Sequence, residues 1–372
     1  MSRIDDLIEE LCPDGVEFLP LGSLLTYEQP SKYIVKNASY SEEYETPVLT
    51  AGQTFILGYT DERTGIHVAS QEKPVLIFDD FTTSFQWVDF PFKVKSSAMK
   101  ILSSKEPYAF ELRYLYHAMR TFTYVPGQHA RQWISTYSNF KVPYPPEQIR
   151  REIVRTLDAF TELEAELEAE LEARKKQYEY YRDQILSRTE TSYRIVTLGD
   201  IAFLKAGSAI KSKDIHATCD PSFRFPVFGG NGIRGYATTH NCSGEHALVG
   251  RQGALCGNVQ WASGEFYATE HAVVTTPSPE INPRWLFHKL ITMELNQYAT
   301  KSAQPGLSVR KLQALQLEVP SLEEQTKSAE ILDKFDALVN DISSGLPAEI
   351  EARRKQYEYY RDKLLTFKEK AS

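Results

Sequence analysis

The feature that most constrains the fold is an internal duplication. The ten residues Arg174–Asp183 return at Arg353–Asp362 with a single Lys-to-Arg exchange, 179 residues later in a chain of 372. Random recurrence of such a string is negligible, so the chain contains two copies of one unit. Each copy reads as about 130 turn-rich residues followed by a long helical segment. A chain of this kind can present two similar surfaces to one extended partner.

Shorter matches extend the duplication on both sides of the ten-residue string. They indicate that the turn-rich block and the start of the helical segment are also repeated. The matching pairs are Leu21-Gly22 with Leu198-Gly199, Val142-Pro143 with Val319-Pro320, Glu147-Gln148 with Glu324-Gln325, and Leu157-Asp158 with Leu332-Asp333.

The pattern predicts an α+β chain (mixed α/β), with two pseudo-repeated globular domains separated by a long antiparallel two-helix coiled coil. Short β-rich runs such as Pro74–Phe78 and Phe225–Phe228 are bounded by turn residues, and helices are expected at about 111–120 and 283–295. The expected segments are an N-terminal helical segment 1–15, a first domain 16–146, a first helix 147–190, a second domain 191–320 and a second helix 321–372.

Apolar residues in the two helical segments recur at steps of three, four or seven, which is typical of a coiled-coil stripe. Pro347 interrupts the second stripe and must kink or restart that helix, because proline removes a backbone donor. Residues 162–173 are three copies of Glu-Leu-Glu-Ala. They are either a simple solvated helix face or a ruler in which each copy adds about 6 Å of helix.

The net charge of −8 argues at first against a nucleic-acid partner, but the charge is unevenly distributed. The two helical segments carry net charges of −4 and −2, whereas the second turn-rich block carries +3. A basic face on the domains therefore remains compatible with the sequence. A solvated acidic enzyme surface is the alternative that charge alone leaves open.

The remaining bulk features favour a cytoplasmic protein with reduced thiols. The sequence has no apolar run of 18 residues and no signal-peptide pattern at its N-terminus, so no membrane is expected. The four cysteines lack a Cys-x-x-Cys spacing. A zinc site built from Cys219, His240, Cys242 and Cys256 matches no common module, and no metal is expected.

Taken together, these residues resemble the specificity subunit of type I restriction-modification systems over essentially the whole chain. The resemblance rests on the opening Asp6–Val16, on Pro320–Gln325 at the start of the second helix, and on the doubled Arg-Lys-Gln-Tyr-x-Tyr-Tyr-Arg string near the helix ends. Two departures are visible. The first helix is two residues longer between Gln148 and Leu157 than the second between Gln325 and Leu332, and the second is four residues longer from there to Arg353.

The resemblance implies a non-catalytic scaffold that reads double-stranded DNA. Each target-recognition domain would read one half of a bipartite, asymmetric site, while the helices set the spacer and dock two methylation subunits. Those partners would hold S-adenosylmethionine and methylate adenine, restriction subunits would join them, and this chain would bind no cofactor itself.

Candidate DNA contacts are polar side chains on the loops of both domains, because Arg pairs with guanine and Asn or Gln with adenine, while Lys suits phosphates. Glycines that only shape turns are the alternative. Asp79 or Asp80 could accept from cytosine, although capping a turn is the expected role for at least one of them. The candidates are Lys32, Lys36, Gln53, Thr82, Thr83, Ser84, Gln86, Lys211, Lys213, Asn231, Arg234, Arg251 and Gln252.

Candidate partner contacts lie in the repeated string near the helix ends. Its tyrosines are expected to pack between the two helices, and the exposed neighbours could dock the partner subunits. The residues are Gln177, Tyr178, Tyr181, Arg182, Gln356, Tyr357, Tyr360 and Arg361.

Two other functions remain open from the sequence. Phe228–Gly232 fits the F-x-G-x-G pattern of an S-adenosylmethionine-dependent DNA methyltransferase, but that motif requires a helix directly after it. No Asn-Pro-Pro-Tyr or Asp-Pro-Pro-Tyr follows to hold a flipped adenine. A coiled-coil scaffold that binds only proteins would explain the helices but not the two elaborate domains.

Overall fold

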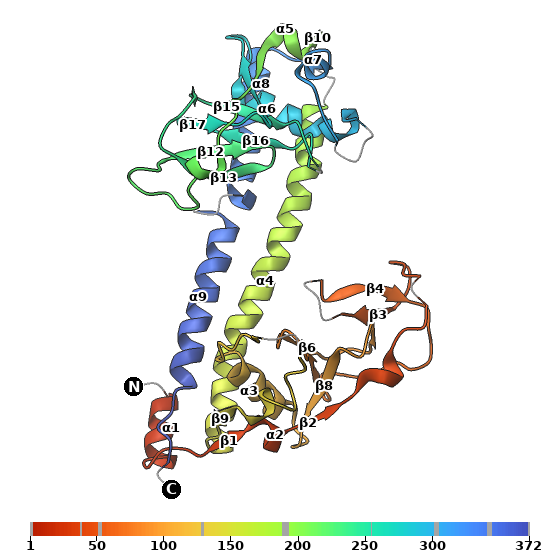
Figure 1. Ribbon diagram of the computed structural model, residues 1–372, viewed down its shortest axis with the longest axis vertical. Helices are drawn as coiled ribbons and strands as arrows, with labels where there is room; N and C mark the ends of the chain where they lie inside the picture. Colours follow the sequence, from red (N-terminus) through yellow and green to blue (C-terminus); the bar gives the residue numbers. More distant parts are fainter. Residues whose placement is uncertain are drawn as a thin grey trace. The chain divides into compact units, whose positions relative to one another are not determined.

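The computed structural model describes residues 3–37, 39–50, 54–127, 130–187, 193–253, 255–300, 305–340 and 344–370. The chain forms two compact units, residues 1–166 with 350–372, and residues 167–349. Each unit combines one turn-rich block with parts of two long helices (Figure 1). The structure is therefore α+β, as the sequence predicts.

The first unit contains a four-stranded sheet of order β2-β8-β5-β6, a three-stranded sheet of order β4-β3-β7, and the pair β1-β9. Every residue of β5 is buried, in agreement with the continuous apolar run Val75–Phe78. The strands are β1 Phe18–Pro20, β2 Leu25–Glu28, β3 Thr46–Leu49, β4 Ile56–Thr60, β5 Val75–Asp79, β6 Phe85–Val88, β7 Lys93–Val94, β8 Met99–Ser104 and β9 Lys141–Pro143.

The second unit repeats this topology, with sheets of order β11-β18-β15-β16 and β13-β12-β17-β14, and the pair β10-β19. The register shifts at Val227/Phe228 in β12, and the first unit shows the same shift at Val48/Leu49 in β3. The duplication therefore extends to the irregularities of the sheets. The strands are β10 Arg194–Thr197, β11 Ala202–Ala206, β12 Phe225–Gly229, β13 Gly232–Ala237, β14 Cys242–Ser243, β15 His246–Gly250, β16 Val259–Ala262, β17 Glu265–Ala268, β18 Ala272–Pro277 and β19 Gln316–Val319.

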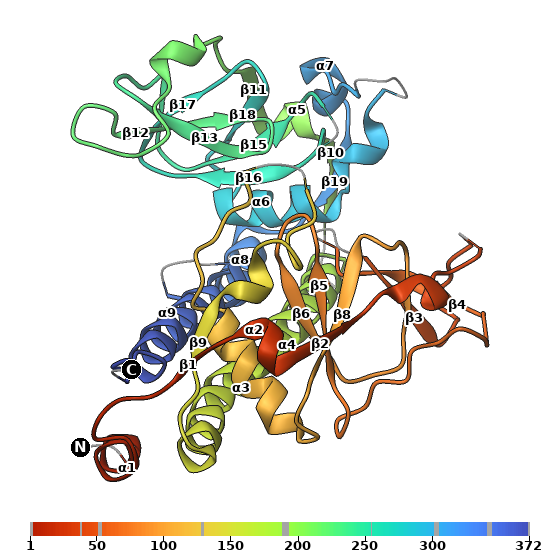
Figure 2. The same ribbon diagram turned by 60° about the horizontal axis from the view of Figure 1, so that its bottom comes forward.

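One helix lies against the sheet of each unit. In the second unit α6 packs along β15 and β16, which Figure 2 shows most clearly, and α3 packs against β8 and β9 in the first. The helices are α1 Arg3–Leu11, α2 Leu21–Leu24, α3 Ala109–Met119, α4 Glu147–Leu186, α5 Leu198–Ile201, α6 Pro283–Thr292, α7 Val309–Gln313, α8 Leu322–Asn340 and α9 Leu346–Leu364. The short 3-10 helices are η1 Pro30–Tyr33, η2 Tyr137–Asn139, η3 Ser212–Asp214 and η4 Leu295–Tyr298.

The two long helical segments differ as the sequence predicts. The first is the uninterrupted 40-residue helix α4. The second is divided into α8 and α9, and Pro347 is the second residue of α9. Proline is tolerated in the first turn of a helix, where the backbone N–H has no intrahelical acceptor. The expectation that Pro347 restarts the helix is confirmed.

The two ends of the chain pair within the first unit. Val16 N donates to Lys368 O at 2.9 Å, and Lys370 N donates to Val16 O at 2.9 Å. Ile4 of α1 and Leu365, just after α9, are buried in the same hydrophobic core. Figure 1 shows α1 below the end of α9. The C-terminal segment thus completes the unit that begins the chain.

A buried polar cluster, here called the first histidine node, joins α3 to both long helices. Its centre is His117, which is fully buried. His117 Nε2 lies 2.8 Å from Asp158 Oδ1 of α4, and Nδ1 lies 2.9 Å from the Tyr357 hydroxyl of α9. Arg113 Nε donates to the same Asp158 oxygen at 2.6 Å. Burial lowers the pKa of His117, so its neutral ring donates to Asp158 and accepts from Tyr357.

The second histidine node repeats this arrangement in the other unit. His288 of α6, also fully buried, lies 2.8 Å from Asp333 of α8 and 3.0 Å from the Tyr178 hydroxyl of α4. Arg284 Nε donates to Asp333 at 2.7 Å. Each node therefore takes its tyrosine from the helix that follows the other domain. The sequence predicts that these tyrosines pack between the helices, whereas both reach a histidine on α3 or α6.

The structure also corrects one match within the duplication. The side chains of Arg150 and Gln325 are both buried, and each donates to the carbonyl five residues earlier, on Pro145 and Pro320. Gln325 therefore corresponds to Arg150 and not to Gln148. The starts of α4 and α8 have equal length, and the expected two-residue difference does not exist.

The nodes predict different effects for tyrosines that are three positions or less apart. Tyr357→Phe leaves the buried Nδ1 of His117 without a donor, so the free energy of unfolding should fall by about 1–3 kcal/mol. Tyr178→Phe should act likewise on the second unit. Tyr359→Phe and Tyr180→Phe are matched controls, because both residues are more than 60% exposed, and should change stability by less than about 0.5 kcal/mol. Urea unfolding measures all four variants, and equal effects at Tyr357 and Tyr359 would contradict the node.

Candidate nucleic-acid interface

The candidate DNA-contacting loops follow corresponding strands in the two units. In the second unit they follow β12 and β15, and their backbones touch. A Cβ added to Gly250 would lie 2.0 Å from Gly230 O, so only glycine fits there. This contact brings Asn231 close to the loop that carries Arg251 and Gln252. Glycine thus allows two reading loops to form one surface, as the Gly-flanked sequence predicts.

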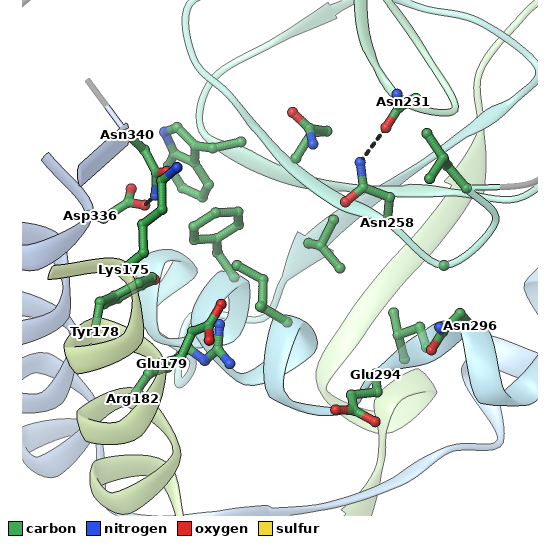
Figure 3. Close-up of a pocket in the computed structure, with 18 of the residues that line it drawn as sticks. Lys175, Tyr178, Glu179, Arg182, Asn231, Asn258, Glu294, Asn296, Asp336 and Asn340 are labelled. Atoms are coloured by element: carbon green, nitrogen blue, oxygen red, sulfur yellow. Dashed lines mark hydrogen bonds between the residues drawn. The ribbon is translucent and has the colours of Figure 1, made fainter. Parts of the chain in front are cut away.

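The candidate side chains on the loops after β12 and β15, here called the second cluster, are held by a small number of contacts. Arg251 N donates to His271 O at 2.9 Å, and Arg251 O accepts from Leu307 N at 2.9 Å. Gln252 is exposed, and Asn231 Oδ1 accepts from Asn258 Nδ2 at 2.7 Å (Figure 3). Arg234 is exposed, and its aliphatic part covers Gly229 on the neighbouring strand. The structure therefore brings three of the four predicted residues together and places Arg234 beside them.

The first cluster is the loop after β5 in the first unit. It carries different side chains on an equivalent backbone. Thr82, Ser84 and Gln86 are exposed after β5, and the Thr82 and Ser84 hydroxyls lie 2.9 Å apart. Thr83 has a φ of 62°, is 7% exposed, and donates its hydroxyl to Thr82 O at 2.6 Å. Thr83 thus shapes the turn and presents no free hydroxyl, unlike the contact expected of it. Gln53 lies outside the described residues.

Both aspartates of this loop have structural contacts. Asp79 Oδ1 accepts from Phe81 N at 2.8 Å and Thr82 N at 3.3 Å, which caps the turn. Asp80 is 1% exposed, and its Oδ1 accepts from Gln132 N at 3.1 Å and Trp133 N at 2.8 Å. Its other oxygen lies 3.4 Å from the buried Lys100 Nζ. Neither carboxylate is therefore presented to a base.

Asp80 and Arg251 occupy the same position in the two units. Asp80 N donates to Ala98 O, as Arg251 N does to His271 O, and Asp80 O accepts from Gln132 N, as Arg251 O does from Leu307 N. Both residues directly follow the central strand of their sheet. One backbone position thus carries a fully paired carboxylate in the first unit and a guanidinium in the second.

The four candidate lysines are all exposed. Lys32 Nζ pairs with Glu28 at 2.7 Å, and this contact raises the pKa of Lys32, so it stays cationic. Lys36 precedes a loop whose backbone N–H groups are held by Glu62. Lys211 and Lys213 flank or lie in the 3-10 helix η3. All four positions are compatible with phosphate contacts.

A pocket of about 960 Å3 lies within the second unit, between α4 and the sheet (Figure 3). Tyr178 and Arg182 of α4, both predicted partner contacts, line one wall with Lys175. Asn258 and Trp261 also line the pocket, with Asn258 across from α4 in Figure 3. None of Asn258, Trp261 and Lys175 was among the predicted contacts, although Lys175 lies in the repeated string.

The predicted partner contacts near the helix ends divide by burial. Tyr178 and Tyr357 are 6% and 2% exposed and belong to the nodes, so their side chains are not available to a partner. Tyr181 and Tyr360 are about 40% exposed and stack on Phe335 and Phe160. Gln356 is exposed, whereas Gln177, Arg182 and Arg361 are half-buried.

The structure offers little support for the rival chemistries. Phe228–Gly232 forms the hairpin between β12 and β13, and the strand β13 follows it where a methyltransferase motif needs a helix.

Among the described residues, no three His, Cys, Asp or Glu side chains gather as metal ligands. Cys219 is exposed, and His240 lies 3.5 Å from Glu265. No helix in the described part of the chain is long and apolar enough to span a membrane.

The buried Asp80 generates a stability prediction. Asp80→Ala would leave Gln132 N and Trp133 N without an acceptor and Lys100 without its counter-charge. Breaking a buried pair by removing one partner costs about 3–5 kcal/mol, so the first unit should be strongly destabilised. The double variant Asp80→Ala with Lys100→Met should recover part of that loss, because no charge then remains buried alone. Thermal unfolding measures both; a single variant as stable as the parent would contradict the assignment.

Comparison with known proteins agrees with this geometry. The profile of the type I restriction modification DNA specificity domain matches twice, at residues 13–173 and 191–352. A type I restriction enzyme EcoR124I/EcoR124II specificity subunit from Escherichia coli is 41% identical, over 99% of this chain and 97% of the relative. The EcoprrI specificity subunit from Escherichia coli is 49% identical over 65% of this chain and 66% of the relative.

Solved structures show the same fold. The S subunit of a type I restriction-modification system from M. genitalium superimposes with a TM-score of 0.63 at 16% identity, covering 94% of this chain and 96% of that one. With two matches to the family profile that together span most of its length, this chain belongs to the type I restriction-modification DNA specificity family.

Proposed function

We propose that this chain is the DNA sequence-specificity subunit of a type I restriction-modification complex and catalyses no reaction itself. The observation that carries the proposal is the position shared by Asp80 and Arg251, where equivalent backbones hold an internally paired carboxylate in one unit and a guanidinium in the other. Loops that carry different side chains on equivalent backbones suit two DNA half-sites of different sequence. Each unit would therefore read one half of a bipartite, asymmetric sequence in double-stranded DNA.

The contacts divide into two classes under this proposal. Arg, Asn and Gln side chains of the loop clusters face base edges, whereas the exposed lysines contact phosphates and fix the register. The complex would act in the cytoplasm. Because the lysine contacts release counterions, binding should weaken steeply as salt rises.

The long helices would carry the catalytic partners. Two methylation subunits that hold S-adenosylmethionine would dock on exposed residues near the helix ends, such as Gln356, Tyr360 and Tyr181, and restriction subunits would join them. The half-buried Arg182 and Arg361 stay within reach of such a partner. Each pairs with the neighbouring aspartate, Asp183 or Asp362. The chain itself would need no cofactor.

The purified chain tests the division of labour. Alone, it should transfer no methyl group from S-adenosylmethionine to duplex DNA, since its described residues form a hairpin at the one candidate motif. With its methylation subunits it should direct methylation to a single bipartite sequence. Radiolabelled methyl transfer measures both mixtures. Transfer by the chain alone would overturn the proposal.

The Glu-Leu-Glu-Ala copies make the spacer testable. They lie inside α4, and deletion of residues 170–173 removes one copy without adding proline or glycine. The helix would shorten by about 6 Å, close to two base pairs, and one end would turn by about 40°. The variant should keep both half-sites and read them across a spacer about one or two base pairs shorter. Methylome sequencing is the measurement, and an active variant with an unchanged spacer would refute the ruler.

A further inference from the structure

Arg251 carries an unpaired buried donor. Its Nε is buried and lacks a hydrogen-bond partner. An unpaired buried donor costs about 1–3 kcal/mol, so a retained one calls for an explanation. At the equivalent position Asp80 satisfies every acceptor it presents. The contrast indicates that the fold does not require Arg251 for its own stability.

Neighbouring anions do not neutralise Arg251 within the protein. Burial raises the pKa of the nearby Cys256 thiol, and the Arg251 charge lowers it by less, so the thiol stays neutral. Glu270 in the adjoining turn pairs with His271 at 3.3 Å. Neither of these two described groups pairs with the buried Nε of Arg251.

The surroundings favour a base edge as that group. The adjacent side chains Gln252, Asn231 and Asn258 are neutral amides that can both donate and accept. Gly253, which has a φ of 90°, follows Gln252 directly and has open space on its Cβ side. No lysine lies among these loop residues, unlike the earlier loop of the same unit that carries Lys211 and Lys213.

We propose that Arg251 is a specificity-determining residue of the second unit, which pairs through its guanidinium with the O6 and N7 acceptors of one guanine. The proposal rests on the specificity function and deepens it by naming the base class and the residue. It also assigns no base contact to the equivalent Asp80, whose acceptors are already used inside the first unit. The recognition code is thus asymmetric at a position where the backbone is the same.

The test uses the chain with its methylation subunits and the sequence that this complex methylates. Binding is measured on duplexes in which each guanine of the second half-site is replaced, one at a time, by 7-deazaguanine, which lacks N7. The parent should lose affinity at one guanine, whereas Arg251→Ala should bind that duplex and the natural one equally. Discrimination against other bases at this guanine should fall by roughly 5- to 150-fold in the variant.

Matched variants separate base reading from a phosphate contact. Arg251→Lys keeps the charge but loses the planar fork, so it should keep the salt dependence and lose the discrimination. Arg224→Ala, an exposed arginine of the same unit, should leave the discrimination at every guanine unchanged. If Arg251→Ala weakens binding equally on all duplexes and lowers the salt slope by about one, Arg251 contacts a phosphate and the proposal fails.

A thermal scan guards against misfolding. Arg251→Ala should be at least as stable as the parent, since it removes an unpaired buried donor, and a large loss of stability would show that the residue is structural. Failure of the underlying function gives a different result: the parent complex itself would then methylate no defined sequence.

Discussion

The fold depends on the buried histidine of each node. His117 and His288 are fully buried, and each joins a recognition-domain helix to a carboxylate on one long helix and a tyrosine on another. A neutral ring can donate once and accept once, so the node fixes three helices with one side chain. Loosening this contact would free the sheet and its reading loops from the helices that carry them.

The origin of the tyrosines explains why the duplication is not a simple tandem repeat. Tyr357 near the end of the chain completes the first unit, and Tyr178 in the middle completes the second. The first unit therefore combines residues from both ends of the sequence, whereas the second is the continuous stretch 167–349, which begins inside α4. The pairing of Val16 with the segment around Lys368 closes the first unit in the same manner. The ten-residue string occurs twice because the tyrosine of each copy makes the same contact with a buried histidine.

Much of the architecture could be predicted from the spacing of apolar residues and the positions of turn residues and proline. The run Val75–Phe78 became a strand buried along its whole length, the stripe through Leu157 became α4, and Pro347 restarted the second helix. Periodicity marks the buried face of a helix but not the element that covers it. That is why the histidine partners of Tyr178 and Tyr357 were missed. Short string matches failed in the same way, since Gln325 has the contacts of Arg150 and not those of Gln148.

The loops were predictable in place but not in role. Glycine-flanked polar residues marked the correct ends of the strands, and turn capping was expected of at least one of Asp79 and Asp80, a role that Asp79 has. The burial of Thr83 and the full pairing of Asp80 depend on residues distant in sequence, such as Lys100 and Trp133. Loop composition does not show which polar groups form hydrogen bonds within the fold. Only the comparison of equivalent backbone positions separated Asp80 from Arg251.

The most direct measurement of the central claim is methylome mapping of a chimaera. Residues 202–277 hold both larger sheets of the second unit but exclude α6 and its histidine node. They would be replaced by the matching segment of a relative with a different site. If each unit reads its own half-site and the helices alone set the spacing, one half of the methylated sequence changes while the other half and the spacer length remain. A change in both halves, or in the spacer, would contradict the account.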